Sequence, residues 1–162
     1  MHSNVLEGLN MDYCRDIRSA VAQLCGSPAH PKLHGTVRFQ QKGSGVLVTA
    51  EVFHLPCGHA SEPEIFALHI HEGGSCEGNA EDPFAGAGGH YNPGNLPHPR
   101  HAGDLPPLFG NHGYAYLSVF TNRFRVSEII GRVVVIHGKP DDFTSQPAGA
   151  AGAKIACGII CC

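Results

Sequence analysis

The stretch between residues 69 and 104 concentrates side chains that can bind metal ions. They are His69, His71, His90, His98, His101 and Asp104. Imidazole nitrogens are good ligands for copper and zinc, and a carboxylate oxygen can complete a zinc site. Because the chain of 162 residues contains twelve histidines, a single His-x-His pair can arise by chance, so the pattern is informative only as a whole. As a whole, it predicts a centre with two metal ions.

A short β-strand is predicted to position the first two of these histidines. Phe66, Leu68 and Ile70 alternate with polar or small residues, which is the period of a strand with one apolar face. His69 and His71 then point to the opposite face. Two imidazoles on one face of one strand can share one ion.

A loop is predicted to hold the second group of ligands. The run from residue 97 to residue 104 cannot be a regular helix, because two prolines and a glycine interrupt it. His98, His101 and Asp104 are therefore expected on a loop that folds round a second ion. His90 follows a glycine-rich run and lies between the two groups.

The rest of the chain predicts an all-β domain. Seven or eight segments have strand composition or alternation, and 21 glycines and 12 prolines favour turns between them. The segments are residues 19–24, 35–41, 46–53, 64–71, 105–109 (the weakest), 114–120, 132–137 and 154–160. Loops as long as residues 72–103 and 138–153 are unusual in a compact domain unless they have a function, which metal ligands would provide here.

Composition restricts the class of protein. With 42 % hydrophobic and 15 % charged residues the chain is globular, and its length suits one domain. We expect an N-terminal extension of unknown role in residues 1–18, with a helical turn near its end, and the main domain in residues 19–162. A net charge of −3 argues against nucleic-acid binding, and no run approaches a membrane span. No signal peptide is visible, so we expect a cytoplasmic location, or an extracytoplasmic one if the chain is a mature form.

Five motifs in the chain resemble those of the copper,zinc superoxide dismutase family, of the bacterial type, and occur in the family's order. They are residues 69–72 (His-Ile-His-Glu), 89–93 (Gly-His-Tyr-Asn-Pro), 101–105 (His-Ala-Gly-Asp-Leu), 130–137 (Ile-Gly-Arg-Val-Val-Val-Ile-His) and 156–160 (Ala-Cys-Gly-Ile-Ile). The likeness extends from about residue 19 to residue 160. It implies an eight-stranded Greek-key β-barrel or sandwich, similar to immunoglobulin domains, with two long functional loops.

The resemblance also implies cofactors, ligands and an activity. Copper would be bound by His69, His71, His90 and His137, and zinc by His90, His98, His101 and Asp104. His90 would bridge both ions through its two ring nitrogens, which requires the loss of both ring protons. The implied reaction is the disproportionation of superoxide, a small anionic substrate, to oxygen and hydrogen peroxide by a redox-cycling copper, with zinc in a structural role.

Two more residues acquire expected roles from the resemblance. Asp141 matches an aspartate that links copper and zinc ligands by hydrogen bonds, although Asp142 could substitute for it, and an ordinary turn carboxylate is the other interpretation. Lys154 stands where family members usually carry an arginine beside the copper. Lysine keeps the charge but lacks the planar fork, so weaker steering of anions is expected, unless Lys154 is only a surface residue of its strand. His90 and Lys154 are thus the expected catalytic residues.

The seven cysteines are an odd number, so at least one is unpaired within the chain. The resemblance implies a disulfide between Cys76 and Cys157. Cys25 is expected to be a small core residue. The resemblance implies no role for Cys57, Cys161 or Cys162. The adjacent pair Cys161 and Cys162 could form a reactive tail, a stray metal site or an intermolecular link. Cys14 lies in the N-terminal extension.

Two other classes of function remain open. One is a non-catalytic module on the same barrel that buffers or delivers copper and zinc, and the other is a structural domain stabilised by zinc alone. The complete ligand set and the cation at Lys154 favour the enzyme over the module. His69, His71 and His137 argue against the structural domain, which would not need them. The family resemblance also allows a homodimer and a copper-delivery partner, without selecting either.

Overall fold

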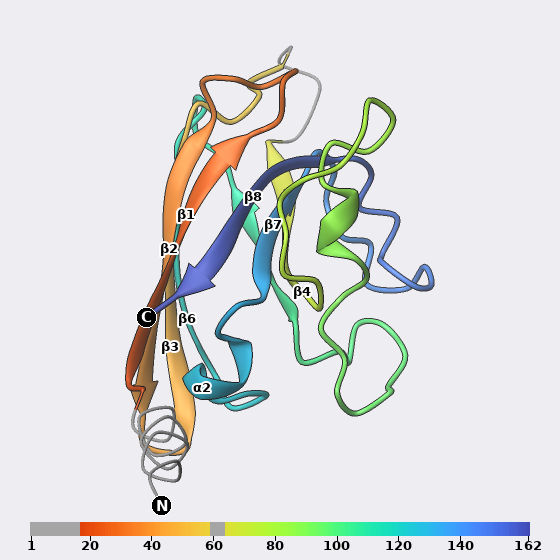
Figure 1. Ribbon diagram of the computed structural model, residues 1–162. Coiled ribbons are helices and arrows are strands. Elements are labelled where there is room, and N and C mark those ends of the chain that lie inside the picture. The colour runs from red at the N-terminus through yellow and green to blue at the C-terminus, as the bar shows by residue number, and fades with distance from the viewer. Residues whose placement is uncertain (1–16, 59–63) are drawn as a thin grey trace, which may run out of the picture.

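The computed structural model describes residues 17–58 and 64–162 (Figure 1). All eight predicted strands are present in this part of the chain. They are β1 (Ser19–Gly26), β2 (His34–Lys42), β3 (Gly45–Phe53), β4 (Ile65–His71), β5 (Asp104–Phe109), β6 (Ala115–Thr121), β7 (Val133–His137) and β8 (Lys154–Cys161). A helical turn α2 (Val126–Ile129) and a 3-10 turn η2 (Ala85–Ala87) complete the regular structure. The predicted extension of residues 1–18 lies, apart from its last two residues, outside the described residues.

The strands form one antiparallel sheet with the order β5-β4-β7-β8-β1-β2-β3-β6. The terminal strands of this order, β5 and β6, contact each other, so the sheet curls into a nearly closed barrel. One layer contains β1, β2, β3 and β6, and β4, β7 and β8 lie opposite (Figure 1). The all-β Greek-key prediction is therefore confirmed. In the described residues, no helix combines the length and apolar character that a membrane span needs.

β2 and β3 show how sequence alternation builds the core. Val37 and Phe39 of β2, and Val48, Ala50 and Val52 of β3, are fully buried, while the residues that alternate with them are more exposed. A two-residue turn joins the strands, and Gly43 in this turn has a φ of 60°, which glycine adopts without steric cost.

β4 is buried on both faces. Phe66, Leu68 and Ile70 point into the main core, whereas His69 and His71 point to the other face, as the alternation predicts. Two long loops cover that second face: the first long loop (residues 72–103) and the second long loop (residues 138–153) (Figure 1). The histidines are therefore enclosed between the sheet and the loops.

A second, smaller apolar cluster attaches the first long loop to the barrel. Phe84 and Ala87 of the loop pack against Val133 and Val135 of β7 and against Cys157 of β8. Val133, Val135 and Cys157 are thus buried although their side chains point away from the main core. This cluster holds the loop over the outer face of the sheet, where the ligands lie.

A disulfide between Cys76 and Cys157 crosses the same contact, as predicted. It links the first long loop to β8 across a sequence separation of 81 residues. Because Cys76 also packs against the small apolar cluster, covalent and apolar contacts fix the loop at the same place.

The expectation that Cys25 is a core residue is wrong. In β1, Ala22 and Leu24 point inward and Cys25 points to solvent, because side chains alternate along a strand. Cys14 lies outside the described residues. The free and exposed cysteines of the described part are Cys25, Cys57, Cys161 and Cys162.

Removing the disulfide is expected to destabilise the protein while leaving its fold intact. In the chain-entropy model a closed loop of this length stabilises the folded state, so the double variant Cys76→Ala/Cys157→Ala should lower the free energy of unfolding by about 2–5 kcal/mol. Guanidinium chloride unfolding of the metal-free protein measures this loss. Cys25→Ala, at an exposed free cysteine, is the control and should change the value by less than about 0.5 kcal/mol. A double variant as stable as this control would contradict the expectation.

Candidate metal centre

The structure brings all seven predicted ligands together in two groups that share one residue. Within each group the potential ligand atoms lie within 4.8 Å of one another, and every residue is buried. The first group is His69, His71, His90 and His137, and the second is His90, His98, His101 and Asp104. His90 therefore stands between the two groups, as the bridging prediction requires.

A ring of backbone hydrogen bonds aligns the three chain segments that carry most of these ligands. The amide of Tyr91 donates to the carbonyl of Ile70 (2.8 Å), the amide of Gly103 donates to Tyr91 (2.9 Å), and the amide of Ile70 donates to Gly103 (2.9 Å). Each of these residues lies next to at least one ligand in the sequence. The ring therefore fixes the ligands of β4, of the first long loop and of the start of β5 relative to one another.

Gly103 must be a glycine because of this close approach. A Cβ atom at this position would lie 2.2 Å from the carbonyl oxygen of Ile70 and 3.1 Å from the Cβ of Tyr91. The first contact is with backbone, which cannot move aside without breaking the ring. The loop can thus approach β4 only where it has no side chain.

Backbone carbonyls determine which nitrogen of His71 and of His137 is free. Nδ1 of His71 donates to the carbonyl of Gly88 (2.8 Å), and Nδ1 of His137 donates to the carbonyl of Gly152 (3.0 Å). In a neutral imidazole the other nitrogen, Nε2, then has a lone pair. The two Nε2 atoms face each other at 3.2 Å. Two lone pairs do not form a hydrogen bond, so this arrangement suits a cation that both can bind.

His69 and His90 add two more free nitrogens on the same side. Nε2 of His69 donates to Asp141 Oδ2 (2.8 Å), which leaves a lone pair on Nδ1. Nδ1 of His69 and Nε2 of His90 are buried, and neither has a hydrogen-bond partner among the described residues. An unpaired buried polar atom is costly, and a metal ion would satisfy both. The first group thus fits copper, which imidazole ligands suit.

Burial keeps these imidazoles neutral. It is the main cause that lowers the pKa of His71 to about 3 and that of His137 to about 4. Burial, followed by the neighbouring His90, also lowers the pKa of His69 far below its usual range. At neutral pH the three rings therefore keep their lone pairs available to a metal ion.

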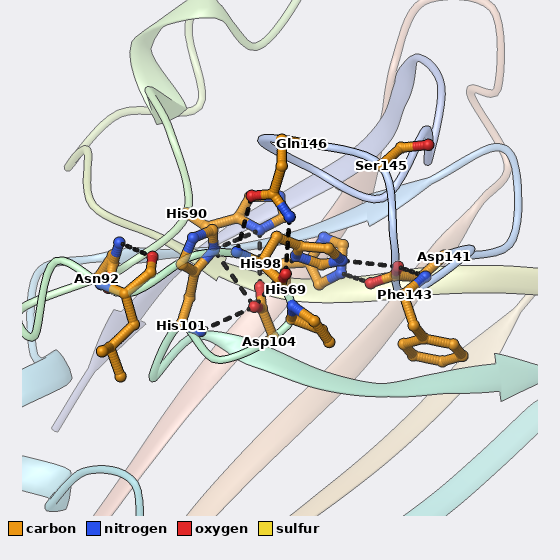
Figure 2. Close-up of polar contacts among 12 residues, drawn as sticks. His69, His90, Asn92, His98, His101, Asp104, Asp141, Phe143, Ser145 and Gln146 are labelled. Carbon is orange, nitrogen blue, oxygen red and sulfur yellow. Dashed lines mark hydrogen bonds and ion pairs between the residues drawn. The ribbon is translucent and has the colours of Figure 1, made fainter.

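Asp104 organises the second group (Figure 2). Its Oδ1 lies 2.7 Å from Nδ1 of His90, and its Oδ2 lies 3.1 Å from Nδ1 of His98 and 3.2 Å from Nδ1 of His101. The His98 contact lacks hydrogen-bond geometry, so that nitrogen remains without a partner. Three Nδ1 atoms and one carboxylate are a donor set that fits tetrahedral zinc.

The carboxylate of Asp104 is ionised in this setting. Burial alone would raise its pKa, but the hydrogen bond from His90 and the surrounding histidines outweigh that effect and lower the pKa. An ionised carboxylate is the state in which Asp104 could bind a zinc ion.

Asp141, and not Asp142, lies between the two groups of ligands. Oδ2 of Asp141 accepts from Nε2 of His69 (2.8 Å), and Oδ1 accepts from Nε2 of His98 (2.8 Å) (Figure 2). Asp142 is exposed, and its carboxylate accepts hydrogen bonds from Ser145, which lower its pKa to about 2. Of the two candidates, only Asp141 contacts a ligand of each group.

Lys154 begins β8 opposite His137 and lines a hollow of about 420 Å³ with His71 and His90. Its ammonium forms an ion pair with Asp82 of the first long loop. The side chain of Lys154 is only 16 % exposed, so it is not an ordinary surface residue of a strand. The sequence contains no signal for the Asp82 contact, because the two residues are 72 positions apart.

Several supporting groups are also missing from the sequence-based prediction. The backbone carbonyls of Gly88 and Gly152 orient two imidazoles. Every residue has such a carbonyl, so the sequence gives no signal for this role. Arg123 donates through Nη1 to the carbonyls of Pro99 (3.2 Å), His101 (3.2 Å) and Asp104 (3.3 Å). This arginine lies after β6 and holds the loop of the second group, a role that only the folded chain reveals.

Comparison with known proteins gives a family that matches this geometry. The sequence model described as copper/zinc superoxide dismutase matches residues 33–160. The copper-zinc superoxide dismutase of Deinococcus radiodurans is 32 % identical over 94 % of this chain and 90 % of its own length. Superoxide dismutase 1 of Aquifex aeolicus is 38 % identical over 78 % and 79 %. That of Photobacterium leiognathi is 33 % identical over 78 % of each chain.

Gly103→Ala is expected to disturb both the fold and the second group of ligands. Its Cβ would meet the carbonyl of Ile70, so we expect a loss of about 1–3 kcal/mol in the free energy of unfolding. Zinc affinity should fall by about tenfold or more, because ligands flank the glycine. Chemical unfolding and chelator competition measure the two effects. Gly94→Ala is the control, since its Cβ would lie at an ordinary 3.5 Å from Leu96. Equal behaviour of both variants would contradict the role of the ring.

Asp141→Asn is expected to lower zinc affinity by about 10- to 100-fold, because one amide cannot accept from both imidazoles. The matched variant Asp142→Asn removes the same charge one residue away and should change the affinity by less than about twofold. Competition with a chromophoric chelator measures both. If Asp142→Asn weakened zinc binding as much as Asp141→Asn, the linking role would belong to neither residue specifically.

Proposed function

The chain belongs to the copper/zinc superoxide dismutase family, and on this premise we propose a role for each residue of its metal centre. It is a superoxide dismutase, which converts two superoxide ions and two protons to oxygen and hydrogen peroxide. Its cofactors are copper and zinc. The proposal therefore concerns which side chains bind, orient and exchange protons during this reaction.

Copper supplies the one-electron redox chemistry when bound, and zinc, which has no redox chemistry, holds its ligands in place. His69, His71 and His137 present Nδ1, Nε2 and Nε2 to the first ion. His98, His101 and Asp104 present their atoms to the second.

His90 is the residue that would bind both ions, since it belongs to both groups of ligands. Its Nε2 faces the first group and its Nδ1 faces the second. In one half of the cycle it holds a proton at Nε2, and in the other it releases that proton. The ring stays oriented meanwhile, because its Nδ1 side remains bound within the second group.

The facing lone pairs of His71 and His137 are the single observation that supports a copper-binding function best. Their tautomers are set by carbonyls, so the two nitrogens at 3.2 Å are both acceptors, and a cation bound by both would satisfy them. A domain stabilised by zinc alone would need only the second group.

Lys154 attracts the substrate in this proposal. It is the lysine or arginine side chain that lines the hollow beside His71 and His137 in the described part of the chain. A cation at this place favours the approach of a small anion. A lysine ammonium is a point charge without the planar, bidentate guanidinium of arginine, so it orients the anion less strictly.

We also propose a cytoplasmic location for the enzyme. A reducing compartment would protect its exposed free thiols from oxidation. The disulfide is compatible with this proposal, because Cys157 is only 2 % exposed. An extracytoplasmic location is the alternative. A homodimer and a copper-delivery partner remain predictions of the family resemblance.

Reconstitution tests the proposed function directly. Metal-free protein loaded with copper and zinc should bind one of each per chain and consume superoxide, with one hydrogen peroxide formed for every two superoxide ions. His137→Ala should lose copper and turnover but keep zinc, because it removes a ligand of the first group only. His112→Asn changes an exposed histidine outside both groups and should leave metals and turnover unchanged. Bound copper without superoxide loss would instead indicate a buffering or delivery module.

A further inference from the structure

The lysine that lines the hollow beside the copper ligands is held in an ion pair. The ammonium of Lys154 contacts Oδ2 of Asp82, whose side chain is 40 % exposed, whereas that of Lys154 is 16 % exposed. Lys154 is thus the more enclosed partner, and its charge is screened less by water. The first long loop brings a negative charge to the cation beside the copper ligands.

The local structure of the loop holds Asp82 in this position. The amide of Asp82 donates to the side-chain oxygen of Asn79 (2.8 Å), and Oδ1 of Asp82 accepts from the amide of Phe84 (3.1 Å). Phe84 itself is anchored in the small apolar cluster against the barrel. With Oδ1 engaged in this turn, Oδ2 is the oxygen that faces Lys154.

The Asp82 carboxylate is ionised where it stands. Partial burial alone would raise its pKa, but the hydrogen bond from Lys154 and that from the Phe84 amide outweigh burial and lower the pKa. The pair therefore consists of two full charges of opposite sign.

We propose that Asp82 is a positioning residue that restrains Lys154 and thereby weakens anion binding in the hollow. An ammonium has three N–H donors, and one of them is committed to Asp82 instead of a substrate anion. The negative charge of Asp82 also cancels much of the field that Lys154 projects into the hollow. This inference rests on the proposed role of Lys154 as the anion-attracting group.

When Asp82 is neutralised, we expect the loss of its negative charge to affect anion binding more than any loss of order in the Lys154 side chain. The side chain of Lys154 is largely enclosed, and its backbone pairs with His137 in the ladder, so the ammonium remains beside the hollow without Asp82. An anion held by Lys154, in contrast, is repelled by the Asp82 charge next to the same ammonium. Removing this repulsion should tighten the binding of a small anion by about two- to fivefold at low salt.

Azide binding to the copper- and zinc-loaded protein measures this effect independently of turnover. Asp82→Asn keeps an oxygen for the Phe84 amide and should tighten azide binding, followed by copper absorption, by about two- to fivefold. Its rate with superoxide should rise and depend more steeply on ionic strength. Glu81→Gln is the matched control, since it removes the same charge from the neighbouring exposed position, and should change azide affinity by less than about 1.5-fold.

Combining these changes with Lys154→Ala shows whether Asp82 acts through the lysine. In the Lys154→Ala background, Asp82→Asn should change azide affinity clearly less than it does in the wild-type background, because only the direct repulsion by Asp82 is then removed. Asp82→Ser, also uncharged and able to accept from Phe84, should reproduce the effect of Asp82→Asn in the wild-type background. The proposal is overturned if Asp82→Asn behaves like Glu81→Gln, or if its effect is equally large without Lys154.

These results are separate from the test of the proposed function. If the loaded wild-type protein did not consume superoxide, the enzymatic function would fail, while the azide affinities would still decide whether Asp82 restrains Lys154. If turnover were present and the azide affinities of the Asp82 and Glu81 variants were equal, the function would stand and this inference would fail.

Discussion

A buried imidazole can offer a lone pair to a metal ion only when its other nitrogen has an acceptor. The metal centre depends on this constraint. The carbonyls of Gly88 and Gly152 provide acceptors for His71 and His137, and Asp141 provides one for His69 and one for His98. Each ring is thereby held in one tautomer with its free nitrogen toward the centre. Because burial keeps the rings of His69, His71 and His137 neutral, their free nitrogens are ready to bind a cation.

The fold provides these acceptors because the two long loops pack against the outer face of the sheet. The backbone ring at Gly103 aligns three ligand-bearing segments, and the small apolar cluster and the disulfide at Cys76 fix the first long loop. The barrel itself contributes rigid strands for His69, His71 and His137. The same loop that supplies Gly88 also places Asp82 against Lys154, so ligand orientation and anion attraction share one structural support.

Strand periodicity made part of this structure predictable, since alternation alone put His69 and His71 on one face of β4. Loop composition and residue types indicated the second group of ligands. His137, the bridging role of His90 and the disulfide followed from family motifs. Features that depend on contacts in the folded chain could not be predicted from the sequence. The choice between Asp141 and Asp142 depends on turn geometry, the exposure of Cys25 depends on the register of β1, and the contact of Asp82 joins positions 72 residues apart. The local residue pattern predicts where strands occur and which face a side chain occupies. Contacts between loops can be identified only in the folded structure.

A crystal structure of the copper- and zinc-loaded protein, with anomalous data at both metal edges, tests the account most directly. The account predicts copper on Nε2 of His90 and zinc on Nδ1 of the same ring, with no proton left on either nitrogen. Both metals would then be found at the two groups of ligands and nowhere else at full occupancy. Copper bound away from His71 and His137, or two metals that do not share His90, would contradict it.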